Sequence, residues 1–309
     1  MKFLSSSLRA VPPALALLAG VTLAAPSPQA APALDPTLAR IKEQRVIRLG
    51  VREVSRPFSY LDEKKQPAGY AVDLCLKAVD AVKAELKLPD IKVEYVVVSG
   101  AERIPKLESG DIDLECGSST NTKARQEKVA FSNTYFVAGA RFAVRKDAAF
   151  DSLSALEGRT IALSKGTTSE KLFNQMQQSG GFKVNLVQYP NNAEAFKAVR
   201  EGKAAAFVHD DVLLMGQITA QSADADMTVT GSPLSVEPYG IMARKSDGAL
   251  LAIVDRTLVG LFQSGEVQKL YDKWFDSKSF KVPMSRLTRD SIARPTKEAG
   301  VAMVLGYSL

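Results

Sequence analysis

Residues 113–125 read DLECGSSTNTKAR, and they pass from a short apolar strand through a hydroxyl-rich turn into a polar helix. A strand that ends in this way directs free backbone N–H groups, hydroxyls and the positive end of a helix towards one point. Arg125 follows within the helix, and its planar guanidinium matches a carboxylate through two parallel hydrogen bonds. Taken alone, the segment is also compatible with an ordinary helix cap.

A second segment repeats this arrangement. The apolar strand at 160–163 (TIAL) runs into SKGTTSE at 164–170, where Thr167 and Glu170 have the spacing of a capping box. Two such turns in two halves of one chain indicate two lobes that close on one anion.

The N-terminus has the pattern of a cleaved secretory signal, which we assign to residues 1–30. Lys2 and Arg9 are the only charges in the first 34 residues, and the apolar run at 14–25 is too short to span a bilayer. Small residues and prolines follow, so we expect cleavage within 24–30, without a nearby cysteine for lipid attachment. An uncleaved anchor would need a longer apolar run. The mature chain is therefore expected to be soluble in the periplasm.

Composition agrees with a folded protein and gives no reason to expect a nucleic-acid partner. Hydrophobic residues make up 46% of the chain and charged residues 24%, close to globular averages. About 280 residues remain after processing, which is enough for two lobes. The formal charge of +6 falls to near +4 without Lys2 and Arg9, and no extended Lys/Arg block occurs.

The two cysteines, Cys75 and Cys116, leave two interpretations open. An exported chain permits a disulfide, and both residues are expected near the same edge of a parallel sheet. Alternatively, both are small buried apolar residues, a common role of cysteine.

Strand and helix patterns alternate along the chain. Alternating or continuous apolar residues predict strands at 45–51, 91–98, 112–116, 160–163, 183–187 and 204–208. Helical spacing predicts helices at 70–85, 103–109, 169–178, 193–201, 248–264 and 267–275. Strands separated by helices imply parallel pairing with right-handed crossovers.

This order predicts an α/β fold of two lobes, each a mostly parallel sheet flanked by helices. Extended apolar segments at 136–146 and 240–244 are the predicted crossover strands between the lobes. The predicted parts are lobe 1 at 38–140 plus 241–285, lobe 2 at 141–240, and a C-terminal tail at 286–309. A ligand is expected between the lobes, at the carboxyl ends of the strands.

Three arginines are predicted to share one edge of lobe 1. Arg52 follows the first strand, Arg103 begins a helix after the second, and Arg125 follows the third. Asp210 and Asp211 follow a strand of the other lobe, where one carboxylate suits an ammonium group and the other a helix cap. A ligand with one ammonium group and two carboxylates, such as glutamate or aspartate, satisfies this set.

At this level of detail the chain resembles the periplasmic amino-acid-binding proteins of ABC transporters (solute-binding family 3), most closely the glutamate/aspartate-binding branch. The resemblance spans about residues 38–275 and rests on short motifs: Arg52-Glu53 with Pro57-Phe58-Ser59-Tyr60, Gly69-Tyr70, Arg103-Ile104-Pro105, Glu115-Cys116-Gly117-Ser118, Arg125-Gln126, Ala206 to Asp211, Tyr239-Gly240 and Lys273-Trp274-Phe275. It implies a type II periplasmic-binding-protein fold that closes on an amino acid and docks on an inner-membrane permease.

The resemblance also implies roles for individual residues. The ligand-binding set is Arg52, Phe58, Ser99, Arg103, Ser118, Thr120, Arg125, Thr167, Thr168, Asn192 and Asp210. The implied holders of the α-carboxylate are Arg125, Ser118, Thr120 and Thr168. Asp210 would hold the ammonium group, and Arg52, Ser99 and Arg103 the side-chain carboxylate. Phe58 resembles an apolar wall residue.

One position departs from that branch. Glutamate/aspartate binders carry a histidine in the loop where this chain reads Tyr189-Pro190-Asn191-Asn192. Asn192 can donate a hydrogen bond but carries no charge. The three arginines still favour an acidic ligand, because burying them without counter-charges is costly.

Two other function classes compete with solute transport. Exported dehydratases share the two-lobed architecture, and Glu115 or Asp210 could serve such an enzyme as acid or base. A separate sensory module would need a receptor partner. The lone His209 is more typical of a structural histidine, and no metal-ligand cluster or nucleophile–base pair is evident from the spacing. We therefore expect a monomeric binding protein without catalytic residues, metal or cofactor.

Overall fold

The apolar strand that precedes the hydroxyl-rich turn lies in the middle of a five-stranded sheet. The sheet order is β5 (Lys92–Val97), β1 (Val46–Val51), β6 (Leu114–Glu115), β15 (Met242–Arg244) and β7 (Val129–Phe131). Strand β1 is parallel to β5 and β6, whereas β15 pairs antiparallel with β6 and β7. We call the part built on this sheet lobe 1. The computed structural model describes residues 34–302 apart from 151 and 181, so the predicted signal at 1–30 lies outside the described residues.

Lobe 1 also contains a small antiparallel sheet and most of the helices. The small sheet consists of β2 (Val54–Ser55), β3 (Ser59–Leu61) and β4 (Pro67–Ala68). The helices are α1 (Pro36–Gln44), α2 (Tyr70–Leu86), α3 (Arg103–Ser109), α4 (Lys123–Gln126), α8 (Gly248–Ser264) and α9 (Glu266–Phe275). Apolar faces of α2, α8 and α9 share one buried cluster with β1, in agreement with their helical spacing.

A second five-stranded sheet forms what we call lobe 2. Its order is β11 (Asn185–Tyr189), β10 (Thr160–Ser164), β12 (Ala206–Asp210), β9 (Ala140–Arg145) and β13 (Met227–Thr230). Its helices are α5 (Thr168–Gln178), α6 (Asn192–Arg200) and α7 (Asp211–Ala220), with short 3-10 turns at Lys146–Ala148 and Leu153–Leu156. Strands β10, β11 and β12 are parallel, and β9 runs antiparallel to β12.

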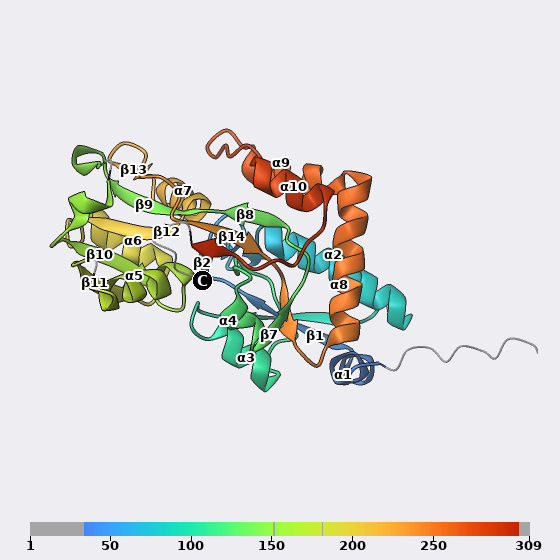
Figure 1. Cartoon of the computed structure of the whole chain (residues 1–309). Helices are drawn as coiled ribbons and strands as arrows, with labels where there is room; N and C mark the ends of the chain where they lie inside the picture. The colour runs from blue at the N-terminus through green and yellow to red at the C-terminus, as the bar shows by residue number, and fades with distance from the viewer. Residues whose placement is uncertain (1–33, 151, 181, 303–309) are drawn as a thin grey trace, which may run out of the picture. The chain divides into compact units, whose positions relative to one another are not determined.

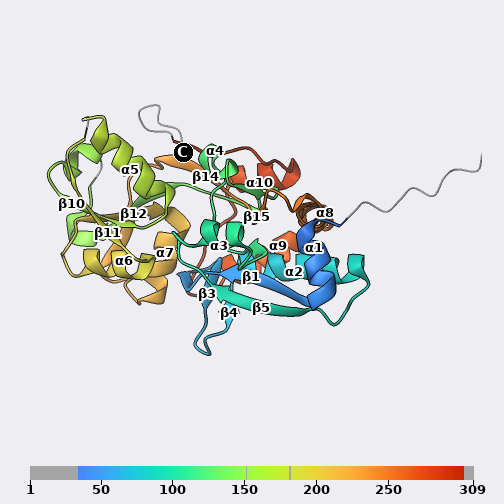
Figure 2. The ribbon, with the colours of Figure 1, turned by 90° about the horizontal axis from the view of Figure 1, so that it is seen from below.

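Neighbouring residues of the lobe 2 strands point to opposite faces of the sheet and build two separate cores. Leu163 and Val208 pack with α5 on one face, whereas Ala162 and Phe207 pack with α6 and α7 on the other. Figure 2 shows α5 on one side of this sheet and α6 with α7 on the other. Because both faces are covered, the strands read as continuous apolar runs in the sequence.

The crossover between the lobes differs in part from the prediction. Strand β8 (Phe136–Ala138) lies within the predicted segment at 136–146, but its partner is β14 (Ser235–Tyr239) and not 240–244. Residues Met242–Arg244 form β15 inside the lobe 1 sheet. The sequence does not predict β14, because Glu237 and Pro238 are not typical of a buried strand.

The predicted tail at 286–309 includes structure that completes this crossover. Helix α10 (Arg286–Ala293) places Thr288 against β8, where its hydroxyl accepts a hydrogen bond from Val137 N at 3.1 Å. Strand β16 (Val301–Ala302) pairs with β14, so β16, β14 and β8 form one three-stranded sheet, which we call the hinge sheet. Figure 1 shows the hinge sheet between the two larger sheets. Over the described part of the chain, helices are too short or too polar to cross a membrane.

Candidate functional site

Polar side chains from both lobes lie at the carboxyl ends of the parallel strands. Arg52 follows β1, Arg103 begins α3 after β5, and Arg125 lies in α4 after β6. From lobe 2, Thr168 begins α5 after β10, and Asp210 ends β12. Arg52, Arg103, Thr168 and Asp210 are each at most 8% exposed, so the structure brings the predicted groups into a closed and nearly dry site.

Two of the arginines reach across to lobe 2. Arg103 Nη2 and Arg125 Nη2 each donate to the carbonyl oxygen of Gly166, both at 3.1 Å. Gly166 lies in the turn between β10 and α5 and has a φ of 77°, a conformation that favours glycine. A Cβ on Gly166 would lie 2.5 Å from the backbone of Gly100 in lobe 1. The two lobes are therefore in direct contact here, as in the closed form of a two-lobed protein.

A carboxylate that the sequence reasoning treated only as an enzyme candidate orients Arg103. Glu115 is fully buried and accepts a hydrogen bond from Ser119 Oγ at 2.7 Å. Ser119 Oγ in turn accepts from Arg103 Nη1 at 2.8 Å. Glu115 therefore positions the guanidinium of Arg103 through Ser119. The spacing of four residues between Glu115 and Ser119 is the sequence signal that could have revealed this role.

Burial and the neighbouring positive charge both weaken the hold of two cleft arginines on their protons. Burial, together with the charge of Arg103, lowers the pKa of Arg52 to about 10. The same two causes lower the pKa of Arg125 to about 9. Both guanidinium groups remain charged at neutral pH, in a site that would be stabilised by an added anion.

Asp210 presents an acceptor to this site. One oxygen, Oδ2, accepts a hydrogen bond from the hydroxyl of Tyr239, a residue of β14 that the sequence reasoning did not select. Burial works against ionisation, but the adjacent His209 first, and then the hydroxyl of Tyr239 and the charge of Arg125, hold the pKa of Asp210 below its usual value. The neighbouring Asp211 accepts from Val212 N at 2.7 Å and so occupies the start of α7. The role at the helix start, which the sequence allowed for either aspartate, thus falls to Asp211.

Glu237 of β14 is a further buried carboxylate that sequence reasoning missed. It accepts hydrogen bonds from Thr168 Oγ1 at 2.9 Å and from Ser235 Oγ at 2.6 Å. Burial first, and then the charge of Asp210, raise the pKa of Glu237 to about 7. Glu237 therefore connects Thr168 of lobe 2 to the hinge sheet, and its carboxyl group is more readily protonated than an exposed one.

Several buried polar atoms around the cleft have no hydrogen-bond partner within the described residues. They include Arg103 Nε, Glu115 Oε1, Asn192 Nδ2, Asp210 Oδ1 and Ser164 Oγ. Buried polar atoms are normally paired, and leaving one unpaired costs about 1–3 kcal/mol. Donors and acceptors that gather unpaired in one place are what a polar ligand would satisfy.

Two residues predicted to contact the ligand, Ser99 and Thr167, bond to neighbouring groups in the structure. Ser99 forms a capping box with Glu102: Ser99 N donates to Glu102 Oε2 at 3.0 Å, and Glu102 N donates to Ser99 Oγ at 3.2 Å. Thr167 Oγ1 accepts from Glu170 N at 3.1 Å and donates to Ser164 O at 2.8 Å. The hydroxyls of Ser99 and Thr167 therefore begin helices α3 and α5.

Phe58, the predicted wall residue, is fully buried in an aromatic cluster. Its ring centroid lies 4.8 Å from that of Phe136 and 5.1 Å from that of Tyr239. Both partners belong to the hinge sheet, so Phe58 packs lobe 1 against the crossover strands.

The remaining predicted residues lie at the cleft. Ser118 and Thr120 are buried in the turn after β6, and Arg125 Nη1 donates to Thr120 O at 2.8 Å. Asn192, at the position of the expected histidine, is buried at the start of α6. Cys75 and Cys116 form a disulfide with an S–S distance of 2.13 Å, which links α2 to the end of β6 behind the turn.

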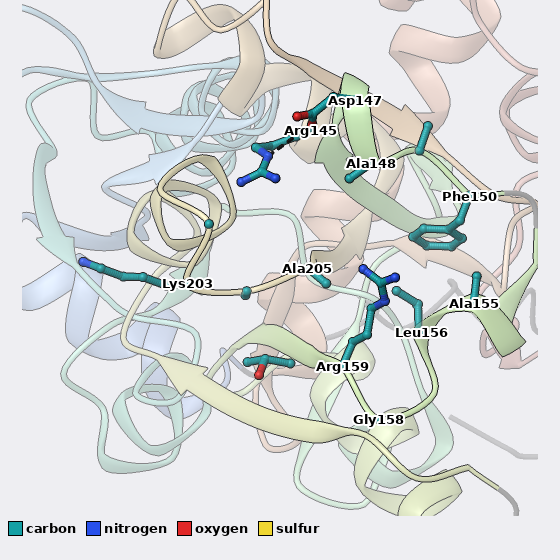
Figure 3. A pocket seen from close by; sticks show the side chains of 14 residues that line it. Arg145, Asp147, Ala148, Phe150, Ala155, Leu156, Gly158, Arg159, Lys203 and Ala205 are labelled. Atoms are coloured by element: carbon teal, nitrogen blue, oxygen red, sulfur yellow. Dashed lines mark hydrogen bonds and ion pairs between the residues drawn. The ribbon is translucent and has the colours of Figure 1, made fainter.

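One cavity lies away from the cleft. A cavity of about 650 Å³ adjoins the opposite edge of the lobe 2 sheet, where Arg145, Arg159, Lys203 and Phe150 line it (Figure 3). Arg145 pairs with Asp147 at 3.2 Å and Lys203 with Glu201 at 2.7 Å, so neighbouring acids offset much of its charge. Within residues 34–302 as described, no group of His, Cys, Asp and Glu side chains is arranged to hold a metal ion.

The fold and the cleft define a two-lobed receptor for a small polar solute. The family model of the bacterial extracellular solute-binding proteins, family 3, matches residues 47–277, and the chain belongs to this family.

Individual proteins resemble the chain over most of its length. It is 39% identical to the L-glutamate/L-aspartate-binding protein of Pseudomonas aeruginosa, over 95% of this chain and 99% of that protein. It is 37% identical to the glutamate/aspartate import solute-binding protein of Escherichia coli, over 85% of this chain and 86% of that protein. Among solved structures, a mutant of ArgBP from T. maritima superimposes with a TM-score of 0.70 at 28% identity, covering 78% of this chain and 99% of that one.

Proposed function

We propose that this protein is the periplasmic solute-binding component of an ABC transporter and that it delivers L-glutamate or L-aspartate to an inner-membrane permease. Support comes from the charge of the cleft and from the similarity to the glutamate/aspartate-binding proteins of P. aeruginosa and E. coli. Arg52, Arg103 and Arg125 face Glu115, Asp210 and a Glu237 that readily holds a proton. With Glu237 protonated, the site has one excess positive charge, which an acidic amino acid neutralises and an amide does not.

The proposed roles follow from the position of each group. Arg125, Ser118, Thr120 and Thr168 hold the α-carboxylate, since they lie in the turns and helices after β6 and β10, which meet where Arg125 donates to Gly166 O. Asp210 holds the ammonium group through Oδ1, which has no hydrogen-bond partner among the described residues and lies 3.5 Å from His209 Nδ1. Arg52 and Arg103 hold the side-chain carboxylate, and Asn192 donates one neutral hydrogen bond.

Hinge closure is the proposed mechanism. The solute first meets the arginines of lobe 1, and lobe 2 then adds Asp210 and the turn at Thr168. Closure is favoured only by contacts that the solute makes in the closed form and not in the open one. We place the lobe boundaries at 38–140 plus 241–285 and at 141–240, with residues 1–30 removed on export, and we propose a monomer that acts by binding and not by catalysis.

Isothermal calorimetry of the ligand-stripped mature protein tests this proposal. Glutamate, aspartate, glutamine, asparagine and arginine are titrated separately. The proposal expects tight one-to-one binding of the acidic pair and weak binding of the amides. Preferred binding of an amide or of arginine would overturn the assigned ligand, and turnover of the bound compound would favour the dehydratase alternative.

A further inference from the structure

Helix α7 of lobe 2 contacts the β2–β3 turn of lobe 1 at a place without room for a side chain. A Cβ built on Gly216 would lie 2.4 Å from the carbonyl oxygen of Arg56 and 3.0 Å from its carbonyl carbon. Non-bonded carbon atoms normally stay about 3.5–4.0 Å apart. An alanine at this position therefore requires the two lobes to move apart.

The adjacent residue ties the same two elements together. Gln217 is 3% exposed, and its Nε2 donates to the carbonyl oxygen of Val54 at 2.7 Å. Gly216 and Gln217 thus join one face of α7 to the backbone of lobe 1. We call this contact, made by Gly216 and Gln217 with Val54 and Arg56, the α7 latch.

The lobe 1 side of the latch is held in place. Phe58 N donates to Ser55 O at 2.9 Å and closes the turn that carries Arg56. Tyr70 N donates to Pro57 O at 2.9 Å, so the first residue of α2 fixes the other end. The carbonyl of Arg56 cannot move away without breaking these bonds.

The latch takes no part in the proposed solute contacts. Arg56 lies in the turn between β2 and β3, and Gly216 lies in the middle of α7, beyond Asp210 and Asp211. The two sides are connected through the chain only by the crossover strands of the hinge sheet. Opening the hinge would therefore separate them, and the latch belongs to the closed form.

We propose that the α7 latch sets the balance between the open and closed forms, with Gly216 as the residue that permits full closure and Gln217 as the bond that holds it. This inference rests on the proposed function, because it assumes that closure accompanies solute binding. A glycine inside a helix is less favourable than alanine. The latch gives a reason for glycine here, since only hydrogen fits against Arg56.

The test compares Gly216→Ala with Gly260→Ala. Gly260 also lies inside a helix, α8, but has open space where a Cβ would be added. Both substitutions favour the helix, so neither ligand-free protein should unfold at a lower temperature. Only Gly216→Ala should weaken solute binding, by about 10- to 100-fold, mainly through faster dissociation, and without changing the ranking of the solutes.

Gln217→Ala provides a second variant that leaves the packing at Gly216 unchanged. It removes one interlobe hydrogen bond and should weaken binding about 3- to 10-fold. Equal affinities for Gly216→Ala and Gly260→Ala would overturn the proposal, as would a lower unfolding temperature of ligand-free Gly216→Ala that accounts for its loss of binding.

A closure measurement separates failure of the latch from failure of the ligand assignment. Spin labels at Ala84→Cys in lobe 1 and Gln178→Cys in lobe 2 report the distance between lobes, while the native cysteines stay in their disulfide. If none of the five amino acids binds, the proposed function fails, and the ligand-free closed population still tests the latch. That population should be smaller in Gly216→Ala than in Gly260→Ala, and equal populations would refute the latch.

Discussion

Two clusters of buried charge in lobe 1 differ in how completely they are paired. Asp113 is fully buried and accepts from Arg40 Nη2 at 2.5 Å, from Arg48 N at 2.8 Å and from Arg244 Nη2 at 3.1 Å. Arg244 donates further bonds to Leu107 O, Ile112 O and Thr37 Oγ1. These bonds join α1, β1, β6 and β15, so this cluster is complete within the protein and serves the fold.

The arginines of the cleft are paired differently. Arg103 and Arg125 donate to a carbonyl oxygen of lobe 2, to a serine and to Thr120 O. Among the residues that the structure describes, no carboxylate forms an ion pair with Arg52, Arg103 or Arg125. Buried arginines that bond only to neutral groups indicate a binding site for an anion, whereas buried arginines that pair with a carboxylate indicate a structural role. The number of buried arginines alone would not distinguish the two.

The largest expected effect is the loss of solute binding when a cleft arginine is removed. Arg125→Ala should weaken binding of the acidic solute by about 3–5 kcal/mol, because a buried carboxylate then lacks two charge-assisted bonds. The unfolding temperature of the ligand-free protein should change little. Calorimetry and a thermal melt measure the two quantities, and a binding loss below about 1 kcal/mol would remove Arg125 from the site.

The matching substitution in the Asp113 cluster should lower the stability of the protein and leave solute binding almost unchanged. Arg244→Ala leaves Asp113 buried without one of its cations and should lower the free energy of unfolding by about 3–5 kcal/mol. Solute affinity of the fraction that remains folded should be close to that of the original protein. Urea denaturation reports the first quantity. A variant of unchanged stability would show that Arg40 alone satisfies Asp113.

Glu237 should make stability depend on pH. Its pKa in the folded protein, about 7, lies above the ordinary value of 4.5, so the folded state favours the protonated form. The contribution to stability is therefore complete below pH 4.5 and is lost as the pH rises towards and through 7. Glu237→Gln should remove this decline, as measured by urea denaturation of the ligand-free protein from pH 4.5 to 8. A decline that persists in the variant would assign it to another group.

The smallest expected effect concerns Asn192. Asn192→His should strengthen binding of glutamate and aspartate by about 1 kcal/mol at pH 6, since a protonated imidazole gives a charge-assisted bond where the amide gives a neutral one. The gain should shrink at pH 8, where histidine is neutral. Equal affinities at both pH values would place position 192 outside the reach of the carboxylates.

The sequence was a good guide where chemistry and regular structure are local. Helices α3 and α8 have the predicted bounds, and the bounds of α2, α5, α6 and α9 agree within one residue, because each has apolar residues at helical spacing and an identifiable start or end. The three arginines and Asp210 lie where the sequence predicted them, at or just after the end of a strand or in the helix that follows it. Ser99 and Thr167 were predicted to contact the ligand, and in the structure their hydroxyls cap helices.

The missed residues depend on partners far away in the chain. Glu237 meets Thr168 across 69 positions, and Asn121 of the hydroxyl-rich turn donates to Lys297 O across 176 positions. Strand β14 reads SVEPY and lacks an apolar alternation, and its Glu237 pairs with Thr168 of lobe 2. A single sequence contains no signal for such pairs.

The sequence by itself determined two α/β halves, two hydroxyl-rich turns before helices and a surplus of arginine at strand ends. Those features arise from residue spacing and from which groups a strand end exposes. The tertiary structure decided which carboxylates pair with which arginines, how the tail completes the hinge sheet and why Gly216 must be glycine. These depend on distances between segments that become neighbours only when both lobes have folded and closed.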